Sequence, residues 1–72
     1  MDIKSYHQIW NDTWQFFKRY MIDMPMTEDG WSALIDDMCV YVAKSEHPGM
    51  AKEMMLVVFR ELEKEYRRRT AA

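Results

Sequence analysis

Glycine and proline are scarce in this chain, whose 72 residues contain two of each. These residues supply most tight turns, so their scarcity argues against a fold of many short strands and favours a few long helices. Cysteine is rarer still, because Cys39 stands alone. A single cysteine excludes an internal disulfide and a cysteine-based zinc site, and it is typical of a reducing compartment.

Long apolar runs and a basic leader are lacking as well. No apolar run approaches the ~20 residues that span a bilayer. The chain begins Met1-Asp2-Ile3-Lys4-Ser5, which does not have the basic and then apolar pattern of a signal peptide. We therefore expect a cytoplasmic protein. The formal charge of −2 and the pI of 5.6 indicate no overall attraction to nucleic acid or to an anionic membrane.

Hydrophobic residues make up 49% of the chain and aromatic residues 14%, a composition typical of a folded domain. A domain of this length removes only about 60% of its unfolded surface from water, so it needs most of its large side chains in the core. A broad apolar arc of roughly 160° is predicted on the first helix. Its members are Tyr6, Ile9, Trp10, Thr13, Trp14, Phe16, Phe17, Tyr20 and Met21.

Apolar residues at helical spacing predict three helices, at about 5–23, 28–45 and 48–69. The joints between them are short, which favours antiparallel neighbours. The sequence therefore predicts one all-α domain over residues 1–72, an antiparallel three-helix bundle. Completion of that bundle by dimerisation is left open.

The helix ends carry recognisable signals. Ser5 is the predicted N-cap of the first helix, or Asp2 if that helix starts earlier. Thr27 is the predicted N-cap of the second helix. Pro48 suits the first turn of the third helix, and His47 is a candidate to cap it.

A helical-wheel projection of each predicted helix separates the positions expected in the core from those at the edges of the apolar face. In the first helix the expected core positions are Tyr6, Ile9, Trp10, Thr13, Phe17 and Tyr20. In the second they are Trp31, Leu34, Ile35, Met38, Tyr41 and Val42, flanked by Cys39 as a small buried residue. In the third they are Ala51, Met54, Met55, Val58, Phe59, Leu62 and Tyr66.

More apolar surface is present than one central seam requires, and the surplus predicts a protein-binding surface. Trp14 and Phe16 lie at the two edges of the first helix's arc. Met24 and Met26 flank a proline in a joint, and methionine recurs on adaptable binding surfaces. Leu56 and Val57 lie off the main stripe of the third helix, as in a helix that also packs against a second copy. We expect a non-enzymatic protein-interaction module, either monomeric or a homodimer.

The alternative is a nucleic-acid-binding accessory protein that uses Lys64, Arg67, Arg68 and Arg69. Three glutamates just upstream argue against it. In addition, cations in the last helical turn complement the helix dipole without binding any partner.

Catalytic and metal-binding patterns are not evident. His7 and His47 are the only histidines, and neither belongs to an H-x-x-x-H or H-E-x-x-H pattern. Asp36 and Asp37 point about 100° apart on a helix, so they do not form a pair for acid–base chemistry. No glycine-rich phosphate loop occurs. We therefore predict no catalytic site, no metal and no cofactor.

Two segments and one tryptophan resemble parts of known proteins: residues 6–18, residues 59–63 and Trp31. They resemble a group of very short helical proteins found among prophages and mobile elements of Gram-positive gut bacteria. The resemblance implies no activity for particular residues. It implies a genetic setting in which compact proteins often bind a host or viral protein, as defence inhibitors and assembly accessories do.

Overall fold

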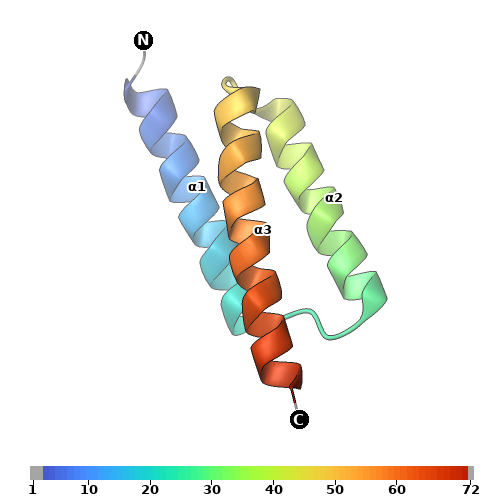
Figure 1. Cartoon of the computed structure of the whole chain (residues 1–72). Helices are drawn as coiled ribbons and strands as arrows, with labels where there is room; N and C mark the ends of the chain where they lie inside the picture. Colours follow the sequence, from blue (N-terminus) through green and yellow to red (C-terminus); the bar gives the residue numbers. More distant parts are fainter. Residues whose placement is uncertain (1–2, 72) are drawn as a thin grey trace.

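A computed structural model describes residues 3–71 and contains three helices, α1 (Ile3–Ile22), α2 (Glu28–Lys44) and α3 (Pro48–Thr70). In the view of Figure 1, α1 runs down, α2 runs up and α3 runs down, so that α1 and α3 are parallel and α2 is antiparallel to both. The molecule is elongated, with extents of 48 × 18 × 16 Å. The predicted all-α three-helix fold is confirmed, and the helix bounds differ from the expected ones by only one or two residues.

The helix starts confirm two of the predicted signals. The Thr27 hydroxyl accepts a 3.1 Å hydrogen bond from the backbone N–H of Gly30 at the start of α2, and Pro48 occupies the first turn of α3. His47 makes no capping hydrogen bond with its side chain. Helix α1 begins at Ile3, so Ser5 lies inside its first turn. The alternative cap, Asp2, falls outside the described residues.

Helix α3 lies between the other two helices and packs against both. Within residues 3–71, no Cα atom of α1 comes within 8 Å of one in α2. Two tyrosines bridge this wider gap. The Tyr20 hydroxyl of α1 donates to Asp37 Oδ2 at 2.6 Å, and the Tyr41 hydroxyl of α2 donates to Asp12 Oδ2 at 2.8 Å.

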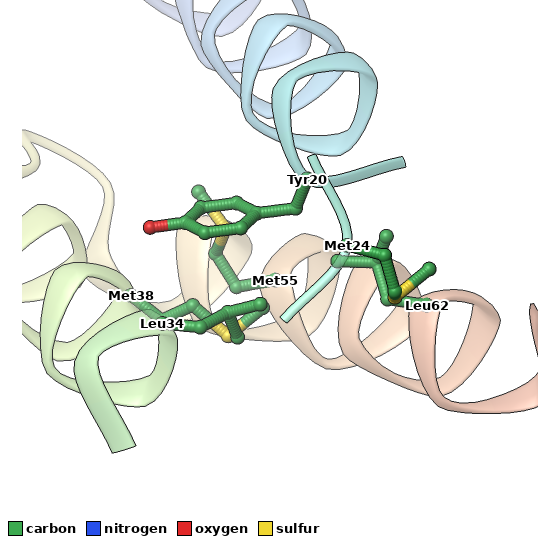
Figure 2. Close-up of a cluster of buried hydrophobic side chains, with 6 residues drawn as sticks. All are labelled: Tyr20, Met24, Leu34, Met38, Met55 and Leu62. Carbon is green, nitrogen blue, oxygen red and sulfur yellow. The ribbon is translucent and has the colours of Figure 1, made fainter. Parts of the chain in front are cut away.

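The core is a cluster of six side chains around α3 (Figure 2). It contains Tyr20, Met24, Leu34, Met38, Met55 and Leu62. Leu34 and Leu62 have no exposed surface at all. Met24 belongs to the same cluster as Leu62, as labelled in Figure 2, and is only 8% exposed. The prediction that Met24 belongs to a partner surface is therefore wrong, because the chain after α1 turns inward and packs this side chain into the core.

Candidate protein-interaction surface

An apolar groove with a volume of about 400 Å³ runs between α1 and α3. Its exposed apolar side chains are Trp10 at 62%, Trp14 at 55% and Val57 at 57%. The rest of its lining is Thr13, Phe17, Met54, Val58 and Glu61. Trp10 and Trp14 are one helical turn apart, so their rings form adjacent parts of one wall. Within residues 3–71, these two tryptophans are the aromatic members of the exposed large hydrophobic side chains.

The groove arises from how α1 is rotated in the bundle. Its buried residues are Ile9, Thr13 and Tyr20, which lie to one side of the middle of the apolar arc. Burial of Thr13 is tolerated because its hydroxyl donates to the carbonyl oxygens of Ile9 at 2.8 Å and Trp10 at 2.9 Å. The prediction of Trp10 as a core residue is wrong. The rotation that buries Ile9 and Tyr20 turns Trp10 outward beside Trp14.

A second apolar groove, of about 520 Å³, lies between α2 and α3. Ile35 and Leu56 line it and are 43% and 38% exposed. Cys39 also lines it and is exposed, so the prediction of a buried cysteine is wrong. Helix α2 faces α3 with Leu34 and Met38, and this leaves Cys39 on the outer rim. Leu56 and Val57 therefore each contribute to a different groove.

The other residues predicted to form the partner surface differ in exposure. Met26 is 58% exposed in the joint after α1. Phe16 is half-buried and packs against the core, with its ring centre 4.8 Å from that of Tyr20. The prediction that Phe16 reaches a partner is not supported by this position, which faces away from the tryptophan groove. Trp10 and Ile35 are exposed residues that the sequence reasoning missed, since both belong to the apolar periodicity that normally indicates a core.

A smaller and more polar groove, of about 220 Å³, lies between the start of α1 and the end of α2. The Tyr41–Asp12 hydrogen bond crosses it, and His47 stacks on Tyr6 with ring centres 4.3 Å apart. The Nε2 atom of His47 is enclosed and has no hydrogen-bond partner among the described residues. Burial, together with the hydrogen bond to Asp12, raises the pKa of Tyr41.

The cations at the end of α3 are paired with glutamates of the same helix. Lys64 lies 3.1 Å from Glu61, and Arg67 lies 3.2 Å from Glu63. Arg68 and Arg69 both contact Glu65, and their hydrogen bonds lower the pKa of Glu65 to about 2. Arg69 also donates to the Met21 carbonyl oxygen at 2.9 Å, which ties the end of α3 to α1. Each predicted phosphate-binding cation therefore has an acidic partner already.

Residues 3–71 contain no group of three or more histidine, cysteine or acidic side chains that could hold a metal ion. No helix in that part of the chain is long and apolar enough to cross a membrane. Comparisons with protein-family models, with curated proteins and with solved structures found no match to this chain.

Proposed function

We propose that this chain is a non-enzymatic protein-interaction module that binds an apolar helix of another protein in the groove between α1 and α3. The observation that carries the proposal is the exposure of Trp10 and Trp14 side by side in that groove. Tryptophan is enriched among the residues that dominate binding energy in protein interfaces. A groove between two helices also suits the apolar face of a third helix.

The exposed area of Trp10 and Trp14 sets the hydrophobic free energy that a partner can gain in the groove. A tryptophan side chain buries up to about 250 Å², so covering these two would remove roughly 300 Å² from water. At about 25 cal/mol per Å², this corresponds to ~7 kcal/mol of gross hydrophobic free energy. The net binding energy is smaller because association costs translational and rotational freedom. The rest of the groove lining, including Val57, adds apolar area to that of the two tryptophans.

The partner that fits this proposal is a protein of the host cell or of a virus, with the chain acting as a phage or mobile-element accessory or inhibitor. The basis for this setting is the sequence resemblance of residues 6–18, Trp31 and residues 59–63. Binding of nucleic acid is less favoured, because Lys64, Arg67, Arg68 and Arg69 are all paired with glutamates. A catalytic role is also not proposed, since the thiol of Cys39 lies in an apolar groove with Lys52 as its one charged lining residue.

A site-specific photo-crosslinking experiment tests the proposal. A photoreactive phenylalanine analogue replaces Trp14 in the chain expressed in its native host, and a matched variant carries it at Ser32, an exposed position on α2. We expect a crosslinked protein from position 14 and none from position 32. The same partner should then bind Trp14→Ala at least tenfold more weakly than the unaltered chain.

Ile22→Ala is the matched control for that affinity measurement. Ile22 is 79% exposed but lines neither apolar groove. Its loss should leave the affinity unchanged. Equal binding by the Trp14→Ala variant, or crosslinks of equal yield from positions 14 and 32, would contradict the proposal.

A further inference from the structure

The chain exposes more surface than its mass predicts. Its accessible area is 5348 Å², whereas a monomeric protein of 8.8 kDa is expected to expose about 4,800 Å². The surplus, roughly 550 Å², is about two thirds of the roughly 800 Å² per chain that a stable interface removes from water. An interface of ordinary size on one face would therefore bring this small domain to the burial expected of a folded protein.

The outer face of α3 is where such an interface would be continuous. Leu56 and Val57 are adjacent on this face and open into the two different apolar grooves. The ridge that they form joins the groove beside Trp14 to the groove beside Ile35. Glu53, Leu56, Val57 and Arg60 fall within an arc of roughly 100° on the helix. All four side chains are exposed.

The charges on this ridge are arranged symmetrically about its apolar centre. Glu53 stands three residues before Leu56, and Arg60 stands three residues after Val57. Neither Glu53 nor Arg60 takes part in an ion pair within residues 3–71. They are seven residues apart, or about 10 Å along the helix, so they are too distant to pair with each other.

We infer that the outer face of α3 is a homodimer interface on which a second copy lies antiparallel, with Glu53 of each copy facing the partner's Arg60. Because Glu53 and Arg60 are equidistant from the centre of the ridge, a two-fold axis there forms both pairs at once. A parallel arrangement would instead place Glu53 opposite the partner's Glu53, and like charges repel. Charge therefore selects the antiparallel arrangement, and apolar contact between Leu56, Val57 and their counterparts supplies the attraction.

This inference rests on the proposed interaction function and names a second copy as the partner on the ridge. Trp10 and Trp14 lie on α1 beside the ridge, and they can be tested separately from it. Failure of the dimer can therefore be distinguished from failure of the proposed function. A chain that stays monomeric but loses a foreign partner on Trp14→Ala would overturn the dimer and retain the proposed function.

Charge reversal with restoration tests the interface. Sedimentation velocity at low salt, from about 10 µM to about 1 mM, should show a species of twice 8.8 kDa in equilibrium with the monomer. Glu53→Arg and Arg60→Glu should each raise the dimer dissociation constant roughly tenfold, because each removes two attractions and creates two repulsions. The double variant should restore the constant to within about threefold of the unaltered chain.

Asp36→Arg is the matched control, since it makes the same type of charge change at an exposed position on α2. It should leave the dissociation constant unchanged. Circular dichroism checks that every variant keeps its helices, and Val57→Glu, at a 57% exposed position, should abolish the dimer without unfolding the chain. A monomer throughout the concentration range overturns the inference, as does a dimer that the double variant fails to restore.

Discussion

The hydroxyl of Tyr41 on α2 donates a 2.8 Å hydrogen bond to Oδ2 of Asp12 on α1, across 29 residues of sequence. With the equivalent bond from Tyr20 to Asp37, it spans the gap between the two helices whose backbones do not approach closely. Helix α3 supplies most of the apolar contact with each neighbour. The two tyrosine–aspartate bonds therefore link α1 and α2 directly, in addition to the contacts that each helix makes with α3.

Removing the Tyr41 hydroxyl should therefore lower stability. We expect Tyr41→Phe to reduce the free energy of unfolding by about 1–2 kcal/mol, because it deletes a hydrogen bond to a charged group that water partly replaces at Asp12. In a domain of this size the midpoint of thermal unfolding should fall by about 5–10 °C. Tyr6→Phe is the control, since the Tyr6 hydroxyl makes no hydrogen bond within residues 3–71, and the midpoint of this variant should shift little. Equal shifts in the two variants would count against the role given to Asp12.

Alkaline pH should weaken the same two bonds. Burial and a hydrogen bond to a carboxylate raise the pKa of both Tyr20 and Tyr41 above the ordinary value of 10.0. The folded state thus retains protons that the unfolded state loses first, so this stabilisation is complete below pH 10 and declines as the pH rises above it. Denaturant unfolding between pH 8 and pH 12 should show the decline. In the Tyr20→Phe, Tyr41→Phe double variant, the free energy of unfolding should decline less steeply with pH. An identical slope in the two proteins would contradict the role given to the two tyrosines.

Leu62 is fully buried in the hydrophobic core. We expect Leu62→Ala to lower the free energy of unfolding by about 2–5 kcal/mol, since it removes buried methyl groups and leaves a cavity. The free energy of unfolding of a domain of this length is about 4–11 kcal/mol in total, so this variant should be close to unfolding at 37 °C. Val40→Ala, at a 51% exposed position on α2, should stay within about 0.5 kcal/mol of the unaltered chain. Chemical denaturation measures both.

The two glycines should respond differently to alanine. A Cβ atom at Gly49 would meet nothing within 4 Å, so Gly49→Ala should stabilise α3 by about 0.5 kcal/mol through lower backbone entropy in the unfolded state. At Gly30 a Cβ atom would lie 3.1 Å from Pro25 Cβ and 3.3 Å from the Thr27 hydroxyl oxygen that caps α2. Gly30→Ala should therefore be at least about 0.5 kcal/mol less stable than Gly49→Ala. The reverse order in thermal unfolding would contradict this.

The sequence determined what depends on local physical chemistry. Periodic apolar residues at 3.6 per turn predict the three helices, and the Thr27 cap and Pro48 mark two of their starts to within one or two residues. The exposure of Leu56 and Val57 could also be predicted, because both lie off the main apolar stripe of α3. These features require no knowledge of how one helix sits against another.

Only the tertiary structure decided which part of each apolar arc is buried. A helix with a 160° arc can pack with either side inward, and the observed rotation of α1 buries Ile9 and Tyr20 and exposes Trp10 beside Trp14. The same holds for Met24, whose burial depends on the path of the joint, and for Tyr41, whose partner Asp12 is distant in sequence. Periodicity defines a face of a helix, but the rotation of that face and the partners of long side chains follow from the packing of all three helices together.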